Sequence, residues 1–339
     1  MTDKSVCIIH TGGTFGMRPT ESGYAPARDL GRLIGGRLPE LGMASMPAWE
    51  LIEYDELLDS ANATPQDWYG LASLIHNNSA RFDGFIVIHG TDTLAYTASA
   101  LSFLLGDFHK PVILTGSQIP LCEVRNDAQS NLISAAQLIA TGRISEVCVC
   151  FGRHIFRGNR TTKVNAIELD AFASPNFLPL VEIGTEFHFS EPAPLPSRVD
   201  VLGKQPPACR DCNIAVLHVF PGISAALVDA VVETGACGIV LRCYGVGTAP
   251  TANAAFLSAL KCASESGTVI VAVSQSAEGS VELRRYSAGS ALADAGVVSG
   301  FDMTAEAAFT KLHALFSLGL DPVIIARTMQ ENLRGELTA

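Results

Sequence analysis

No apolar run in the sequence is long enough for a membrane-spanning helix, although apolar residues make up 48% of the 339 residues. Charged residues are scarce at 17%, and acidic ones outnumber basic ones, so the net charge is -11. Because an acidic surface repels a phosphate backbone, nucleic acid is a poor candidate partner. The opening segment MTDKSVCIIHTGG has too short an apolar run for a secretory signal. We therefore expect a folded cytoplasmic protein with a large core, binding neither membrane nor nucleic acid.

The cysteines lack the spacing of a disulfide framework, and their number, nine, is odd. Most lie inside apolar runs, among them Cys148, Cys150 and Cys243, as packing residues do in a reducing compartment. Cys209 and Cys212 form a C-x-x-C in the segment CRDC. A structural zinc site needs a second pair at matching spacing, which the sequence does not contain. We expect reduced cysteines and no metal.

Short apolar runs alternate with longer segments of helical pattern along the chain. The runs predicted as strands are VCIIH (6–10), GFIVIHG (84–90), PVILTG (111–116), EVCVCFG (146–152), IAVLHVF (214–220), GIVLRCY (238–244) and TVIVAVS (268–274). They are continuous rather than alternating, as expected of parallel strands covered on both faces. The clearest helical segments are 93–105 and 128–141. This repetition predicts an α/β fold with largely parallel sheets.

A proline-rich stretch without periodicity interrupts the pattern between about residues 189 and 212. The length of 339 residues also favours two domains. We predict a larger N-terminal α/β domain (1–190), a linker (191–212) and a smaller C-terminal α/β domain (213–339).

The segment HTGGTFGM (10–17) follows the first predicted strand. It lacks both the lysine of a P-loop and the glycine spacing of a dinucleotide-binding loop, so phosphate binding is poorly supported. Its paired glycines allow the backbone to approach a ligand closely and would leave Thr14 exposed in a pocket. Two interpretations of Thr14 stay open from this segment alone: a helix cap or a reacting hydroxyl.

Polar side chains also follow other predicted strands, where ligands bind in open α/β sheets. HGTDT places Thr91 and Asp92 after one strand, TGSQ places Ser117 after the next, and RGNRTTK ends at Lys163. A lysine packed against a threonine and an aspartate can take the proton of a nucleophilic hydroxyl. The alternatives are an N-cap role for Asp92 and a solvent-exposed basic loop around Lys163.

A rival nucleophile is Ser224, in the segment GISAA between a predicted strand and a helix. The segment resembles the G-x-S-x-G turn of serine hydrolases, and His313 downstream suits the order of a triad. Its last glycine is replaced by Ala226, which favours the simpler interpretation that Ser224 caps a helix.

Three further polar positions have local interpretations. Tyr24 directly follows a polar segment that Gly16 and Gly23 bracket, which is typical of a mobile flap; an ordinary surface loop with one aromatic anchor is the alternative. Asp59 and Ser60 indicate a turn and cap before a helix that begins at about residue 65.

Taken together, the motifs TGGTFGM, HGTDT, TGSQIP and RGNRTTK resemble those of bacterial L-asparaginases of the asparaginase/glutaminase family. The segments DAFASPN (170–176), FPGISA, LRCYGVG and NLRGELT are similar to the type I, cytoplasmic branch, so the resemblance covers essentially the whole chain. It implies two α/β domains and hydrolysis of L-asparagine to L-aspartate and ammonia without a cofactor. It also implies a homodimer or homotetramer.

The resemblance implies roles for individual residues. The catalytic set is Thr14 as nucleophile, Tyr24 on the flap, and Thr91, Asp92 and Lys163 as a proton-handling cluster. The substrate-binding set is Gly13, Asp59, Ser60, Ala61, Gly90 and Ser117. A second, allosteric asparagine site in some relatives matches Thr162, Arg242, Ser274, Gln275 and Ser276, with Ser276 standing where such relatives have cysteine. A serine esterase using Ser224 and a non-catalytic asparagine sensor are the competing hypotheses.

Overall fold

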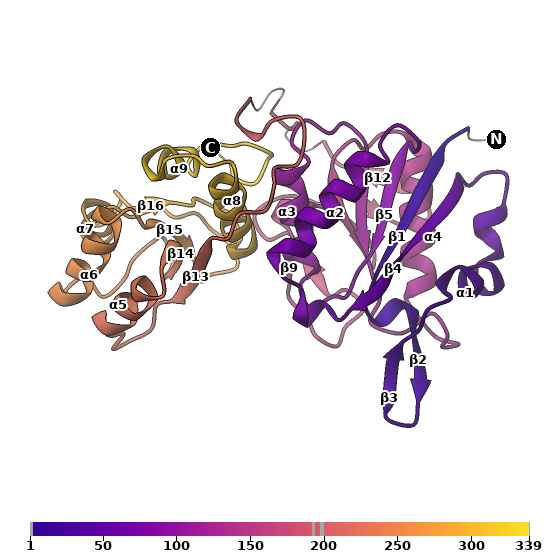
Figure 1. The fold of residues 1–339 in the computed structure, drawn as a ribbon, viewed down its shortest axis with the longest axis horizontal. Helices are drawn as coiled ribbons and strands as arrows, with labels where there is room; N and C mark the ends of the chain where they lie inside the picture. The colour runs from indigo at the N-terminus through magenta and orange to yellow at the C-terminus, as the bar shows by residue number, and fades with distance from the viewer. Residues whose placement is uncertain (1–2, 192–193, 197–199, 339) are drawn as a thin grey trace. The chain divides into compact units, whose positions relative to one another are not determined.

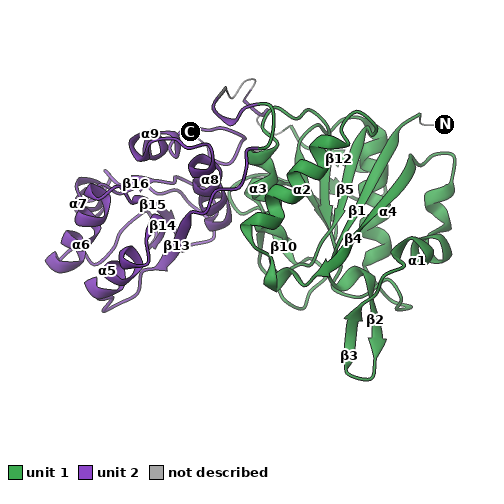
Figure 2. Ribbon diagram, viewed as in Figure 1, with its two compact units in different colours: residues 1–192, 204–206 green, residues 193–203, 207–339 purple. Residues whose placement is uncertain are grey.

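The computed structural model describes residues 3–191, 194–196 and 200–338 (Figure 1). They form two compact units, residues 1–192 with 204–206 and residues 193–203 with 207–339, which we call unit 1 and unit 2 (Figure 2). Parts of the predicted linker, residues 192–193 and 197–199, lie outside the described residues. Across the described ranges, no helix combines the length and apolar character needed to cross a membrane.

Unit 1 is built on an eight-stranded sheet of order β12-β11-β8-β7-β6-β5-β1-β4. Its strands are β1 (Ser5–Gly12), β4 (Ala48–Leu58), β5 (Gly84–Ile88), β6 (Val112–Thr115), β7 (Val147–Phe151), β8 (His154–Arg157), β11 (Val181–Ile183) and β12 (Phe187–Phe189). Strands β4, β1, β5, β6 and β7 run parallel, and β8, β11 and β12 are added antiparallel to their neighbours. Two small hairpins complete the strands of this unit: β2 (Met17–Thr20) with β3 (Gly23–Pro26), and β9 (Thr162–Lys163) with β10 (Phe172–Ala173).

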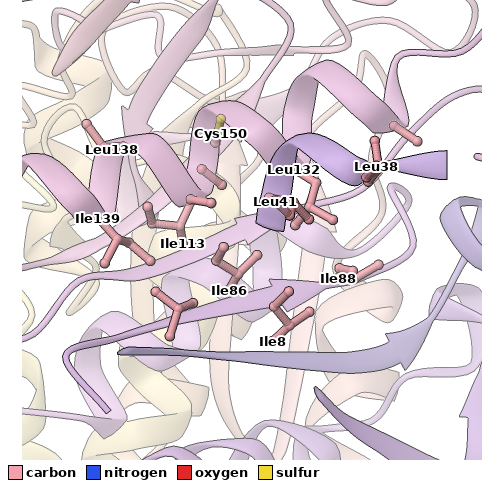
Figure 3. Packing of buried hydrophobic residues seen from close by; sticks show 14 of the residues in the cluster. Ile8, Leu38, Leu41, Ile86, Ile88, Ile113, Leu132, Leu138, Ile139 and Cys150 are labelled. Atoms are coloured by element: carbon pink, nitrogen blue, oxygen red, sulfur yellow. The ribbon is translucent and has the colours of Figure 1, made fainter. Parts of the chain in front are cut away.

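The helices of unit 1 are α1 (Leu30–Arg37), α2 (Pro65–Asn77), α3 (Leu94–Leu104) and α4 (Ala128–Thr141). On one face of the sheet, Ile86 and Ile113 pack against Leu132 and Ile139 of α4 (Figure 3). Each such fully buried aliphatic side chain contributes about 1.5–3 kcal/mol. Helices α2 and α3 contact each other, and α3 also contacts β6 and β7. Covering both faces is what makes these strands continuous apolar runs.

Unit 2 is built on a parallel sheet of order β13-β14-β15-β16. Its elements are β13 (Asn213–His218), α5 (Ala225–Glu233), β14 (Ala236–Cys243), α6 (Ala254–Glu265), β15 (Val269–Ser274), α7 (Ser287–Asp294), β16 (Val298–Ser299), α8 (Ala305–Ser317) and α9 (Pro322–Thr328). Ile239 and Leu241 of β14 belong to one apolar cluster with Val228 of α5 and Phe256 of α6. Gly238 of β14 instead lies against α8. Helices α5 and α6 therefore cover one face of this sheet and α8 covers the other.

The predicted α/β class is confirmed, with a larger parallel-rich sheet followed by a smaller parallel one. Every predicted strand matches an observed one within a few residues, as do the predicted helices 93–105 and 128–141. Strand β4 was not predicted, because AWELIEYDELL is an edge strand whose side chains are half-buried or exposed throughout. The short antiparallel strands β8, β11 and β12 were also missed; only tertiary pairing defines strands of three or four residues.

The C-terminal segment NLRGELT is held in unit 2 by a fully buried ion pair. Lys311 Nζ of α8 lies 2.6 Å from Glu336 Oε1, and both side chains are 0% exposed. The Glu336 carboxylate also accepts hydrogen bonds from the backbone N–H groups of Leu333 and Arg334. Burial lowers the pKa of Lys311, whereas the Glu336 charge opposes that shift.

Replacing Lys311 with methionine is expected to lower the free energy of unfolding of unit 2 by about 3 kcal/mol, because it leaves the Glu336 charge buried without its cation. The backbone N–H groups that remain on Glu336 keep the loss at the lower end of the usual range. Urea unfolding followed by circular dichroism measures it. The matched control is Lys261→Met, at an exposed i,i+4 pair with Glu265, which should change stability by less than about 0.5 kcal/mol. Equal effects of the two substitutions would contradict a structural role for the buried pair.

Candidate active site

The carboxyl ends of four neighbouring parallel strands of unit 1 bring the predicted polar residues to one edge of the sheet. In sheet order, β4 leads to Asp59, β1 leads to Thr14, β5 leads to Thr91 and β6 leads to Ser117. Ligands bind at such edges in open α/β sheets. The structure thus gathers segments that are far apart in the sequence.

Paired glycines allow the ends of β1 and β5 to touch. A Cβ at Gly13 would lie 2.5 Å from the Cα of Gly90, and Gly13 has a positive φ of 84°. A Cβ at Gly90 would lie 2.4 Å from Oγ of Ser60. Because any side chain at Gly13 or Gly90 would collide with its neighbour, both positions require glycine. Their close approach brings together Ser60, Gly13 and Gly90, three members of the predicted substrate-binding set.

Thr14 is the first residue of a short 3-10 helix, Thr14–Gly16, whose N-cap is Gly13. Thr14 is therefore not a helix cap, and that interpretation is wrong. Its side chain is half-buried, whereas Phe15 beside it is buried in the core that packs on the sheet. No side chain or backbone group in the described parts of the chain hydrogen-bonds the Thr14 hydroxyl, which leaves this group available to a ligand.

The second cluster is joined by direct hydrogen bonds. Lys163 Nζ donates to Thr91 Oγ1 at 2.9 Å and to Asp92 Oδ1 at 2.7 Å. Thr91 is buried, and the Lys163 side chain is 21% exposed, against 62% for Asp92. The partly buried lysine is thus held between a hydroxyl and a carboxylate, an arrangement suited to moving a proton.

Both simpler interpretations of this cluster are wrong. The N-cap position of α3 is Thr93, not Asp92, and Asp92 instead binds Lys163. The basic segment before Lys163 is not a solvent-exposed loop, since Arg157 and Arg160 are each 2% exposed. Lys163 itself lies on β9, paired with Phe172 of β10.

Two residues that the sequence reasoning did not assign to the site position its parts. Thr93 donates from Oγ1 to the carbonyl oxygen of Ser60 at 2.8 Å, which ties the β4 end to the β5 end. The buried carboxylate of Asp127 accepts hydrogen bonds from the backbone of Gln118 and Ile119. It thereby holds the loop of Ser117. Thr93 and Asp127 both lie at the start of a predicted helix, and that position was the only sequence signal that pointed to them.

The substrate-binding candidates differ in exposure. Asp59 is exposed and caps a 3-10 helix, accepting a hydrogen bond from the backbone N–H of Ala61 at 3.1 Å. Ala61 is exposed and Ser60 is buried. Ser117 is buried at 1% exposure, and its hydroxyl has no hydrogen-bond partner within the residues that the structure describes. A buried hydroxyl without a protein partner at this edge suits contact with a ligand.

Tyr24 is not placed at the Thr14 hydroxyl. It lies on the β2–β3 hairpin, which projects from the body of unit 1 (Figure 1), and it is 50% exposed. Its hydroxyl donates to Glu123 Oε1 at 2.7 Å, and this hydrogen bond raises the pKa of Tyr24. The segment predicted as a flap is thus a hairpin held by Glu123, and a contact between Tyr24 and Thr14 would require that bond to break.

Ser224 and His313 are not arranged as the nucleophile and base of a serine hydrolase. Ser224 caps α5, its hydroxyl accepting a hydrogen bond from the backbone N–H of Ala226 at 3.2 Å, as the simpler interpretation predicted. His313 is buried on α8, and burial lowers its pKa to about 4. Because α5 and α8 cover opposite faces of the sheet, Ser224 and His313 cannot form a dyad.

The residues of the predicted allosteric set belong to both units. Thr162 lies on β9 of unit 1. In unit 2, the Gln275 side chain donates to the carbonyl oxygen of Arg242 at 2.7 Å, and the Ser274 hydroxyl accepts a hydrogen bond from the backbone of Ser276 at 3.0 Å. These contacts define one compact turn after β15 around Arg242. Their regulatory role stays a prediction.

Over the described residues, no group of three or more His, Cys, Asp or Glu side chains is arranged to hold a metal ion.

Comparison with known proteins shows which family the chain belongs to. Residues 5–195 match the family model "Asparaginase, N-terminal" and residues 213–329 match "Glutaminase/Asparaginase C-terminal domain". The chain is 45% identical over 338 residues to L-asparaginase 1 of Escherichia coli K12, covering 100% of this chain and 99% of that one. The chain belongs to the asparaginase family.

Solved structures agree with that assignment. L-asparaginase I from Vibrio cholerae superimposes with a TM-score of 0.89 at 40% identity, with 99% of each chain covered. The thermostable L-asparaginase from Thermococcus kodakarensis gives a TM-score of 0.84 at 31% identity, again over 99% of each chain. Both L-asparaginase 1 of Escherichia coli and L-asparaginase I of Vibrio cholerae are similar to this chain over essentially its whole length.

Proposed function

We propose that this protein is an L-asparaginase that hydrolyses L-asparagine to L-aspartate and ammonia through a covalent intermediate on Thr14. The hydrogen-bonded cluster of Lys163, Thr91 and Asp92 carries the proposal, because it supplies a proton acceptor at the sheet edge where Thr14 begins its short helix. Similarity over the full chain to proteins named L-asparaginase supports the choice of substrate. No cofactor is needed for this chemistry.

In the first half of the reaction, the Thr14 oxygen attacks the carbon of the side-chain amide and loses its proton. The tetrahedral intermediate collapses, the C–N bond breaks and ammonia leaves with the transferred proton, so that an ester links aspartate to Thr14. The oxyanion needs hydrogen-bond donors, and we assign this role to backbone N–H groups near Gly13 and Gly90, where two segments approach closely because neither glycine has a side chain. Tyr24 assists after its hairpin moves and its bond to Glu123 opens.

In the second half, a water attacks the ester carbon and its proton passes to the cluster that contains Thr91 and Lys163. The ester C–O bond then breaks, the Thr14 oxygen takes back the proton that the cluster holds, and aspartate is released with the Thr14 hydroxyl restored. The free carboxylate oxygen of Asp59 suits the α-ammonium group of the substrate, and Ser60 and Ser117 offer hydroxyls to its polar atoms.

Initial rates of ammonia release from L-asparagine and L-glutamine, measured over a wide concentration range, test this function. We expect turnover of asparagine, and the glutamine rates measure the extent of glutaminase activity. A sigmoidal rate curve would support the allosteric set of Arg242 and its neighbours. Binding of asparagine by calorimetry with no ammonia release at any enzyme concentration would instead identify a sensor, and labelling of Ser224 by a fluorophosphonate would identify an esterase.

The same resemblance extends to a cytoplasmic location and to pairing of subunits as a homodimer or homotetramer. Light scattering of the purified full-length protein measures the oligomeric state. A monomeric mass in a catalytically active sample would contradict the expected pairing.

A further inference from the structure

Three partly exposed cysteines lie near the start of the unit 2 sheet and have no part in the proposed reaction. Cys209 and Cys212, the C-x-x-C of the sequence, precede β13, and Cys237 is the second residue of β14. Among the described residues, no group of three or more His, Cys, Asp or Glu side chains is arranged to hold a metal ion, these cysteines included. The remaining chemistry of close thiols is reaction with each other.

The pairing of β13 with β14 brings two of these cysteines together. Asn213 pairs with Ala236 and Ile214 pairs with Gly238, so Cys237 is the extra residue of a bulge. Cys212 comes directly before this bulge, and its thiol is in hydrogen-bond contact with the thiol of Cys237. Cys212 comes one residue before the Asn213–Ala236 pair and Cys237 one residue after it, so the two cysteines are diagonal neighbours on strands that lie about 4.8 Å apart.

A backbone contact fixes the Cys237 side chain at this place. Its Sγ donates to the carbonyl oxygen of Asn213, the residue after Cys212, at 3.2 Å. The Cys212 contact lowers the pKa of Cys237 and raises the pKa of Cys212, because the Cys212 S–H donates to the Cys237 sulfur. Cys237 is therefore the better nucleophile of the two.

The buried cysteines are different. Burial raises the pKa of Cys7 to about 11 and the pKa values of Cys150 and Cys243 to about 12, which keeps them protonated and unreactive. Cys262 is exposed on α6. Cys212 and Cys237 are distinguished by two properties together: their thiols contact each other, and both side chains are partly exposed.

We propose that Cys212 and Cys237 are a modification site, a dithiol that hydroperoxides oxidise reversibly to a disulfide. The Cys237 thiolate attacks a peroxide oxygen, the O–O bond breaks, and hydroxide or alkoxide leaves as Cys237 becomes a sulfenic acid. The Cys212 sulfur then attacks the Cys237 sulfur; the S–S bond forms, and the sulfenic oxygen leaves with the Cys212 proton as water. The two thiols together lose two electrons, which reduce the peroxide. A small dithiol reverses the reaction by exchange.

The bond would join the edge strand β13 to β14 and close a chain loop that contains α5. Such a cross-link restricts the unfolded chain, so the oxidised protein should unfold at a higher temperature than the reduced protein. This inference is independent of the proposed activity, and its test requires no turnover.

The full-length reduced protein is treated with hydrogen peroxide, its remaining thiols are alkylated, and it is digested without reductant for mass spectrometry. The expected product is a Cys212–Cys237 cross-linked peptide that dithiothreitol releases. Cys209→Ser and Cys262→Ser should retain the cross-link. Cys212→Ser should lack it and leave a sulfenic acid at Cys237 that a cyclic 1,3-dione traps.

Circular dichroism of each variant checks that unit 2 is folded before oxidation. A Cys209–Cys212 disulfide as the main product would overturn the proposal. So would oxidation of Cys262 at the same rate as the pair, with no cross-link formed in folded protein.

Discussion

Replacement of Thr14 by alanine is expected to lower kcat for ammonia release from asparagine by about 10³-fold or more, because it removes the attacking oxygen. The side chain is half-buried and makes no hydrogen bond to the described residues, so the fold should not change. A coupled ammonia assay measures the rate, and calorimetry measures whether asparagine still binds.

Thr14→Ser is the matched control, because serine keeps the oxygen and loses only a methyl group. It should retain far more activity than Thr14→Ala. If Thr14→Ala stays within about tenfold of the parent protein, Thr14 is not the nucleophile. Thr91 would then be the remaining hydroxyl of the site that contacts a base.

Replacement of Lys163 by methionine is expected to lower kcat by about 10²–10⁴-fold, the usual range for the loss of a proton-transfer group. Methionine keeps most of the side-chain volume but breaks the bonds to Thr91 Oγ1 and Asp92 Oδ1. The same ammonia assay measures the loss, and a hydroxamate trap for the acyl-enzyme shows which half of the reaction slows.

Two further variants separate proton transfer from simple charge. Lys163→Arg keeps the positive charge but cannot give up its proton near neutral pH, so it should be almost as inactive as Lys163→Met. Lys261→Met, at an exposed lysine of α6, should leave the rate unchanged. Full activity of Lys163→Arg would show that the cluster needs only a cation.

Several parts of the site were predictable because the signal was local. A short apolar run covered on both faces, followed by glycine and then a serine or threonine, marks a parallel strand and its carboxyl end. That pattern located Thr14, Thr91 and Ser117. Ser224 was likewise predictable as a cap from its place before a helix.

Other parts depended on contacts distant in sequence. Strand β4 is identifiable only by its pairing with β1, since an edge strand carries no strong apolar pattern. The same holds for the support that Thr93 gives to Ser60 and for the bond of Tyr24 to Glu123, which spans 99 positions. No local periodicity encodes such pairs.

The sequence by itself determined the α/β class, the ends of the buried strands and the motifs that resemble the asparaginase family, because each is written in adjacent residues. The tertiary structure decided which strand ends lie next to one another. Sheet order places β4, β1, β5 and β6 side by side, and two glycines let Gly13, Gly90 and Ser60 touch. The tertiary structure also places Lys163, on a hairpin remote in sequence, within hydrogen-bond distance of Thr91 and Asp92. Strand order and side-chain reach arise from packing over the whole chain, and short sequence windows do not contain that information.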